Sequence, residues 1–396
     1  MIVAWSGCAG LALVIAVALS TFQPHGHAEP VQAEPATTAG SAAPAQGRWQ
    51  RAAPGRVITL PADHAAHPAY RLEWGYYTGN LQAGDGRSYG YQVTFFRVGV
   101  DPAPVNPSIF AVRDLYMTHV AITDLQAKRH RFADRLNRAG PQWAGARADR
   151  YEVWNEAWRA SLDGQGRHRV VADAGTFALD LTLDAGKPVV LQGEGGYSRK
   201  GRDAGNASHY YSLTRMPTTG SLTVDGRRLD VRGASWMDHE FGTSALDAGT
   251  RGWDWFALQL SDGRDLMLYR LRLDDGTQGP FSGGTLVERD GRSRHLGAGD
   301  FSLTPGRQWR SPASGASYPV AWDVRVPVAR LHLQVTAAVD AQELRTRRST
   351  NVTYWEGSVR VAGEDAAGPG SPREVRGVGY LEMTGYSGAK MSDVMR

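Results

Sequence analysis

Cysteine is almost missing from this chain of 396 residues. The single cysteine is Cys8, close to the amino terminus. The rest of the chain therefore has neither a disulfide nor a thiol nucleophile. A long basic run is missing as well: 44 lysines and arginines stand against 40 acidic residues, and the formal net charge is only +4. Nucleic-acid binding usually needs a basic stripe, so we expect no nucleic-acid partner.

Motifs for metal binding and for serine catalysis are also missing. The sequence has no His-Glu-x-x-His, and its only His-x-His is His25–Gly26–His27. We therefore expect no metal and no cofactor. The one Gly-x-Ser-x-Gly match, Gly86–Gly90, lies between an Asp-Gly turn and an expected strand. A nucleophile elbow joins a strand to a helix instead, so we interpret this match as accidental.

The amino-terminal segment resembles an export signal. Residues 1–24 carry no charged side chain, and Leu11–Leu19 form a short apolar core. We predict a signal peptide over residues 1–33 and a flexible linker over residues 34–55. An uncleaved anchor is the alternative, but the apolar part is shorter than the roughly 20 residues that span a bilayer. The predicted location is periplasmic or secreted.

Short strands separated by turns dominate the remaining sequence. Tyr89–Phe96 is rich in aromatic and β-branched residues and follows the turn signal Gly84–Asp85–Gly86. Similar turns recur along a chain that has 47 glycines and 20 prolines. These features predict an all-β protein. One stretch, Ala127–Arg138, has the composition of a helix.

Two similar segments within the sequence indicate an internal duplication. Leu81–Arg87 resembles Leu258–Arg264, and aromatic residues precede both segments. Because hairpins with Asp-Gly turns are common, chance is the alternative explanation. Duplication predicts two β-barrel or sandwich domains, over residues 56–250 and 251–396, with each sheet curled so that few strand edges are exposed.

Blocks of sequence between Trp74 and Tyr386 carry a family resemblance. They are Trp74–Leu81, Tyr89–Arg97, Tyr210–Arg215, Ser235–Gly242, Gly252–Phe256, Tyr354–Gly357 and Gly379–Tyr386. In this order they resemble the family of AttH and hydroxyneurosporene synthase, also called carotenoid 1,2-hydratase. The resemblance implies two lipocalin-like β-domains. Some members of that family hydrate the terminal double bond of acyclic carotenoids, whereas others are described as predicted secreted hydrolases or as accessory proteins of an ABC transport system. The central block, Trp236–Gly242, is closer to AttH than to the carotenoid hydratases.

The central block also holds the densest run of ionisable groups, Asp238–His239–Glu240. On a strand, Trp236, Asp238 and Glu240 would point to one face and His239 to the other, but the pattern does not say which face lines a cavity. We expect these three ionisable residues to be catalytic, with Asp238 as the proton donor and His239 positioning it or a water molecule. A neighbouring carboxyl such as Glu240 would help to keep Asp238 protonated near neutral pH.

Aromatic residues and one further histidine are the candidates for binding an apolar ligand or stabilising a carbocation. They are Trp74, Tyr77, His119, Tyr211, Trp236, Trp253, Trp255, Trp355 and Tyr380. Packing in a core is the alternative for each of them, because aromatic side chains dominate protein cores. Glu356 and Glu382 are expected to be buried partners of arginine.

Besides a purely structural envelope protein with filled barrels, two functions remain open at this point. The first is acid-catalysed hydration or rearrangement of an apolar, isoprenoid-like substrate. The second is a non-catalytic periplasmic carrier of a lipid or another apolar small molecule, with an ABC transporter ATPase or permease as a possible partner.

Overall fold

The computed structural model describes residues 48–106, 108, 111–140, 142–243, 246–366 and 372–394. Within these ranges the chain is almost entirely β, as predicted, with two short 3-10 turns, Ala62–His64 and Pro327–Ala329, and a short helix α1, Met391–Val394. The expected signal peptide and most of the expected linker lie outside the described residues. Among the described residues, no helix combines the length and the apolar character that crossing a membrane requires.

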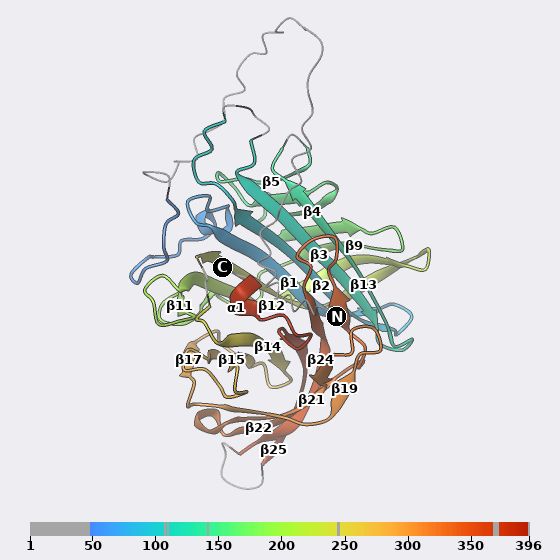
Figure 1. Cartoon of the computed structure of the whole chain (residues 1–396). Coiled ribbons are helices and arrows are strands. Elements are labelled where there is room, and N and C mark those ends of the chain that lie inside the picture. Colours follow the sequence, from blue (N-terminus) through green and yellow to red (C-terminus); the bar gives the residue numbers. More distant parts are fainter. Residues whose placement is uncertain are drawn as a thin grey trace, which may run out of the picture.

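The first sheet is built from the amino-terminal half of the described chain (Figure 1). Its strands are β1 Leu72–Ala83, β2 Ser88–Gly99, β3 Asp114–Asp124, β4 Arg129–Arg138, β5 Ala144–Ala146, β6 Glu152–Asn155, β7 Trp158–Leu162, β8 His168–Asp173, β9 Phe177–Leu183, β10 Val190–Leu191, β11 Tyr197–Arg199, β12 Ala207–Val224 and β13 Arg227–Gly242. Their order is β4-β3-β2-β1-β13-β12-β9-β8-β7-β6-β5, and β10 and β11 also pair with β12. Because β4 lies against β5 and β6, the sheet is a nearly closed, lipocalin-like barrel.

The second sheet follows from the carboxy-terminal half. Its strands are β14 Thr250–Leu260, β15 Asp265–Leu273, β16 Gly283–Val287, β17 Ser293–Gly297, β18 Ser302–Pro305, β21 Ala321–Val326, β22 Leu331–Ala337, β23 Glu343–Arg345, β24 Thr353–Asp365 and β25 Arg373–Met383. The order is β17-β16-β15-β14-β25-β24-β22-β21-β18, with β23 beside β24. A separate ribbon joins β19, Gln308–Arg310, to β20, Ser317–Pro319.

The two similar sequence segments, Leu81–Arg87 and Leu258–Arg264, occupy the same position in the topology of the two sheets. In each sheet the first strand lies between the second strand and the last one. The first hairpin turns through Gly86 (φ 84°) and the second through Gly263 (φ 91°), a backbone conformation that glycine adopts without a Cβ penalty. The two sheets therefore share the topology of their opening strands.

The expectation of a helix at Ala127–Arg138 is wrong. The chain turns at Leu125–Lys128 and continues as β4, which pairs with β3 from Asp124–Arg129 to Leu115–Arg138. Long-range pairing with β3 satisfies the backbone here, and this tertiary contact outweighs the weak helical propensity of the segment.

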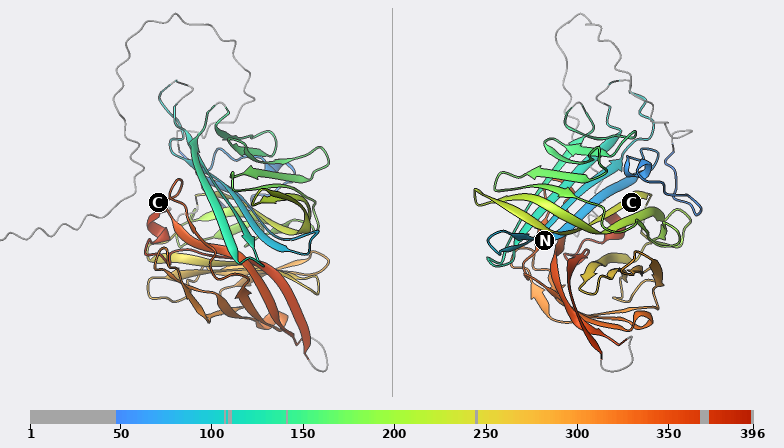
Figure 2. Two further views of the ribbon diagram at one scale, coloured as in Figure 1. Left: turned by 90° about the vertical axis from the view of Figure 1, so that its right-hand side faces the viewer. Right: turned by 180° about the vertical axis from the view of Figure 1, so that it is seen from behind.

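The two sheets lie one on the other, as both views in Figure 2 show. Each has an apolar interior of its own, and a third cluster of aromatic side chains fills the space between them. Ion pairs also join the sheets: Asp265 on β15 accepts hydrogen bonds from Arg215 at 2.6 and 2.9 Å and lies 2.8 Å from Lys187 Nζ. The boundary between the sheets is thus a packed and buried region that can hold a site.

Candidate functional site

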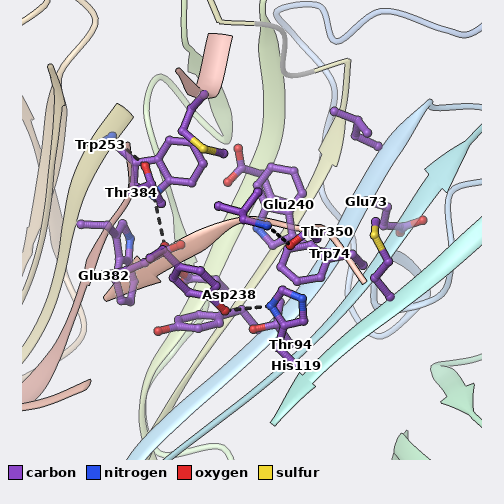
Figure 3. A pocket seen from close by; sticks show the side chains of 18 of the residues that line it. Glu73, Trp74, Thr94, His119, Asp238, Glu240, Trp253, Thr350, Glu382 and Thr384 are labelled. Carbon is purple, nitrogen blue, oxygen red and sulfur yellow. Dashed lines mark hydrogen bonds between the residues drawn. The ribbon is translucent and has the colours of Figure 1, made fainter. Parts of the chain in front are cut away.

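A cavity of about 290 Å³ lies between the two sheets. Strands β1, β2, β3, β12 and β13 form one wall, and β14, β15, β24 and β25 form the other. Figure 3 shows Asp238, Glu240 and Glu382 around this space together with Trp74 and Trp253. The volume is at the lower end of the range for small-molecule pockets.

The first sheet contributes side chains to the cavity wall, and the strand register arranges them in two rows that run across the strands. Thr94, Tyr76 and Asp238 are direct neighbours across β2, β1 and β13. One step along, Trp74 on β1 pairs with Glu240 on β13. Because side chains alternate along a strand, Asp238 and Glu240 both point into the cavity, which matches the alternation expected from the sequence.

Asp238 is buried in a shell of hydrogen-bond donors. Its Oδ1 accepts from Ser212 at 2.5 Å and from Trp236 Nε1 at 2.7 Å, and its Oδ2 lies 2.7 Å from the Tyr210 hydroxyl. Burial raises the pKa of Asp238 to about 7, and the Glu240 carboxyl adds to this rise, although the three donors oppose it. A substantial fraction of Asp238 is therefore a neutral acid at neutral pH.

Glu240 is the ion-paired carboxylate of the cavity. It lies 2.9 Å from Lys200 Nζ and accepts a short hydrogen bond from Ser208. The ammonium of Lys200 also lies 5.2 Å from the ring centre of Tyr210 and 5.0 Å from that of Tyr269. Burial lowers the pKa of Lys200, but the attraction of Glu240 outweighs it and the net pKa is raised. One wall of the cavity thus holds a neutral acid beside a buried ion pair.

Glu356 and Glu382 face the cavity from the second sheet, where they are direct neighbours on β24 and β25. Burial raises the pKa of Glu382 to about 7, opposed by a 3.1 Å hydrogen bond from Trp253 Nε1. Burial and the charge of Glu382 raise the pKa of Glu356 well above its usual value. The expectation of arginine partners is wrong: among the described residues, the groups that act on the two glutamates are each other, Asp238, Glu240, tyrosines and Trp253, and none is an arginine.

His119 lies on β3 at the edge of the cavity. Its ring nitrogens lie 2.8 Å from the Tyr354 hydroxyl and 2.9 Å from Ser349 Oγ, both contributed by the carboxy-terminal half of the chain. Burial lowers the pKa of His119 to about 3, so the ring is neutral. It holds the two walls together and presents no charge to a ligand.

His239 points away from the cavity, into the first barrel. Its Nε2 lies 2.9 Å from Glu73 Oε1, and its Nδ1 lies 2.9 Å from the Tyr211 hydroxyl. The expected contact with Asp238 is therefore wrong, because consecutive residues of β13 face opposite sides. Arg97 also donates to Glu73 at 3.2 Å, and His67 Nδ1 lies 2.8 Å from Glu73 Oε1.

His67, Glu73 and His239 are the described residues whose ligand atoms lie close enough, within 4.8 Å of one another, to hold a metal ion. Both ring nitrogens of His67 are already engaged, by Glu73 and by Asp63 at 2.9 Å. Glu73 is also paired with the Arg97 guanidinium. The donor set is thus satisfied by internal hydrogen bonds and an ion pair.

The other predicted ligand residues divide between three environments. Those that line the cavity are Trp74, His119, Trp253 and Trp255. Those buried in the interior of a sheet are Tyr77 and Tyr211 in the first barrel and Trp355 in the second. Two belong to the aromatic cluster between the sheets without lining the cavity, Trp236 and Tyr380. Tyr77, Tyr211 and Trp355 are therefore packed in the cores of the sheets and do not line the cavity.

Sequence reasoning missed several polar residues of the cavity, namely Tyr76, Lys200 and Tyr210, and it gave Glu356 and Glu382 another role. Tyr76, Tyr210, Glu356 and Glu382 lie in the blocks that carry the family resemblance, so a signal was present. Nothing in the local sequence marks Lys200, which lies in a loop and reaches the cavity only in the folded chain.

Comparisons with known proteins agree with this architecture. A family profile described as AttH-like matches residues 51–386. The chain belongs to the AttH-like family. A crystal structure of a candidate AttH protein from Nitrosomonas europaea is 34% identical and has a TM-score of 0.76, and the match covers 85% of this chain and 99% of that one. Kievitone hydratase from Nectria haematococca shares the fold, with 16% identity, a TM-score of 0.64, and coverage of 86% of this chain and 97% of that one. No curated protein matches the chain.

Proposed function

We propose that this AttH-like protein hydrates a carbon–carbon double bond in an apolar, isoprenoid-like molecule bound between its two sheets, with Asp238 as the proton donor. One observation carries the proposal: Asp238 is a buried acid on the cavity wall, and its pKa is raised to about 7. A group with this pKa keeps its proton at neutral pH and can donate it to a bound substrate.

The hydrogen bonds around Asp238 indicate which oxygen carries the proton. Oδ1 already accepts from Ser212 and Trp236, whereas Oδ2 accepts only from the Tyr210 hydroxyl and keeps a second lone pair that can carry a proton. The transferable proton therefore resides on Oδ2. Trp255 Nε1 lies 3.3 Å from the Tyr210 oxygen and holds that hydroxyl in place.

The reaction balances without a cofactor. The Oδ2–H bond of Asp238 breaks as the π electrons of the alkene form a new C–H bond, which leaves a carbocation and the Asp238 carboxylate. A water oxygen then forms the C–O bond, and its proton returns to the carboxylate. The net change is the addition of one water molecule to the alkene.

The wall of the cavity suits a carbocation. The faces of Trp74, Trp253 and Trp255 supply electron-rich surfaces, and each such contact contributes about 0.5–2 kcal/mol. The ionised Glu240 adds a negative charge on the same face as Asp238. Because the site is buried, these interactions are stronger than they would be in water.

Product analysis tests this function. The protein is incubated with acyclic isoprenoid alkenes in ¹⁸O-labelled water, and mass spectrometry follows the gain of one labelled water. The proposal expects labelled tertiary alcohol from the wild type and none from Asp238→Asn. Product formed equally by both proteins would remove Asp238 from the mechanism.

A carrier is the second candidate function, favoured by the aromatic lining of a cavity that lies between two sheets. In this version an exported, periplasmic or secreted protein holds a lipid or another apolar small molecule for an ABC transporter, and Asp238 only binds the ligand. Native mass spectrometry of protein purified from its own host separates the two candidates. Unchanged ligand that copurifies and is never hydrated favours the carrier, whereas a copurifying alcohol with its parent alkene favours the enzyme.

A further inference from the structure

Two buried oxygen atoms on the cavity wall lack a hydrogen bond of normal geometry. Among the described residues, these are the Tyr76 hydroxyl and Glu356 Oε1, whose side chains lie close enough to influence each other's pKa. Both side chains line the cavity, and they are 7% and 2% exposed. A buried polar atom without a partner costs about 1–3 kcal/mol, so both atoms point to a ligand or to water that completes them.

These atoms belong to one polar patch that bridges the two sheets. Tyr76 on β1 is the cross-strand neighbour of Asp238, and Glu356 on β24 is the cross-strand neighbour of Glu382. The hydroxyls of Tyr76 and Tyr354 lie close enough to Glu356 to oppose the rise in its pKa. The charges of Asp238 and Glu240 contribute to the raised pKa of Glu382. The patch therefore adjoins the acid that is proposed to protonate the alkene.

The chemical state of the patch defines what it can bind. A glutamic acid that keeps its proton offers one O–H donor and one acceptor, and a tyrosine hydroxyl offers the same pair. A ligand hydroxyl complements this set because it both donates and accepts. A saturated hydrocarbon group at this position would leave the two atoms unpaired.

We infer that Tyr76, Glu356 and Glu382 form a subsite for a neutral hydroxyl group, so that the ligand is a hydroxylated, isoprenoid-like molecule with its alkene next to Asp238. The inference rests on the proposed function for the place of the alkene, but the hydroxyl subsite itself requires no turnover. It also applies to a carrier.

A matched set of ligands tests the subsite by binding alone. The probes are geraniol, the corresponding hydrocarbon in which methyl replaces the hydroxymethyl group, and geranylamine. Quenching of tryptophan fluorescence reports binding, because Trp74, Trp253 and Trp255 line the cavity. For the wild type we expect geraniol to bind about tenfold more tightly than the hydrocarbon, the value of one neutral hydrogen bond.

The variants Tyr76→Phe and Glu356→Gln should reduce this preference. Tyr91→Phe is the matched control for the first, because Tyr91 is also a buried tyrosine of the first sheet but forms a hydrogen bond with Ser235 inside the barrel. Glu343→Gln is the control for the second, because Glu343 bonds Ser311 and Tyr318 away from the cavity. Both controls should keep the tenfold preference.

The stability of the free protein gives a second readout. Because the Tyr76 hydroxyl makes no hydrogen bond of normal geometry, Tyr76→Phe should unfold at a temperature close to that of the wild type. Tyr91→Phe loses a real hydrogen bond and should unfold at a lower temperature. A clear loss of stability in Tyr76→Phe alone would assign Tyr76 a structural role and overturn the inference.

The remaining outcomes are also decisive. Equal affinity for geraniol and the hydrocarbon, the absence of saturable geraniol binding, or a preference that survives both variants would overturn the hydroxyl subsite. Tighter binding of geranylamine would show that the glutamate pair binds a cation instead. Hydroxyl preference without any hydrated product would leave the subsite standing and count against the proposed enzyme.

Discussion

Asp238 and His239 are adjacent in the sequence but face different compartments: Asp238 lies on the cavity between the sheets, and His239 is hydrogen-bonded to Glu73 inside the first barrel. The alternation of a β-strand causes this separation. It divides the central sequence block into an acid that faces the ligand space and a histidine that belongs to an internal network. Asp238 and the network around His239 therefore lead to different predictions.

Replacing Asp238 with asparagine should remove activity while the fold is retained. The amide is similar in size and can still accept from Ser212 and Trp236, but it has no acidic proton to transfer. Loss of a general acid typically costs a factor of 10² to 10⁴ in rate. The measurement is product formation under saturating alkene, with circular dichroism to confirm the fold. Asp290→Asn, at an exposed turn, is the control that should keep full activity.

Activity should fall as the pH rises above about 7. The proton donor is the neutral form of Asp238, and its pKa is about 7, so above that value the rate should drop about tenfold for each pH unit. The measurement is the pH dependence of kcat/KM, or carbon-13 NMR of the aspartate carboxyls where an assay is lacking. A rate that rises through this range would identify a base in place of an acid.

The same pKa predicts a pH dependence of stability. Because the folded-state pKa of Asp238 is raised above its usual value of 3.8, its favourable contribution is complete below about pH 4 and is lost as the pH rises to about 7. The loss is at most about 4 kcal/mol, since each unit of pKa is worth about 1.4 kcal/mol. Asp238→Asn should lack this part of the pH dependence in urea unfolding. Parallel curves for the two proteins would contradict the raised pKa.

The sequence predicted the strands better than it predicted the site. Turns at Gly84–Gly86 and Ser261–Gly263 indicate hairpins because glycine is needed where φ is positive, and the alternation at Trp236–Phe241 follows from strand geometry alone. The position of the cavity does not follow from local pattern. It depends on which outer face of one sheet packs on the other, and that choice brings Glu382 to Asp238 from a distant part of the chain. The prediction of a helix over the segment Arg129–Arg138 is wrong for the same reason, since pairing with β3 determines the conformation of this segment.

Two substitutions beside Asp238 should move its pKa in opposite directions. Trp236→Phe removes a donor that stabilises the carboxylate, so the pKa of Asp238 should rise and the fall in activity should move to higher pH. Glu240→Gln removes a like charge, so the pKa of Asp238 should fall and the fall in activity should move to lower pH. Each shift is expected to be on the order of one unit. NMR titration of Asp238 in both variants measures it, and shifts in the same direction would show that another group sets the pKa.

Glu73→Gln should destabilise the first barrel without changing the titration of Asp238. Glu73 is paired with Arg97 and lies within hydrogen-bond distance of His67 and His239, so the glutamine would leave the buried Arg97 guanidinium with one carboxylate partner, Asp114, in place of two. Because Asp114 still pairs with Arg97, the cost should lie toward the lower end of the roughly 3–5 kcal/mol for breaking a buried pair. Glu156→Gln, at a half-exposed position, is the control and should change stability by less than about 1 kcal/mol.

The effect of Glu73→Gln should also depend on pH, with a sign opposite to that of Asp238. Burial alone would raise the pKa of Glu73, but His67, His239 and Arg97 lower it well below its usual value. Its contribution to stability is therefore present above about pH 4.5 and is lost as the pH falls through the lowered pKa. The difference in unfolding free energy between wild type and Glu73→Gln should shrink in acid. A difference that stays constant from neutral to acid pH would mean that the carboxylate of Glu73 does not hold Arg97 and the two histidines.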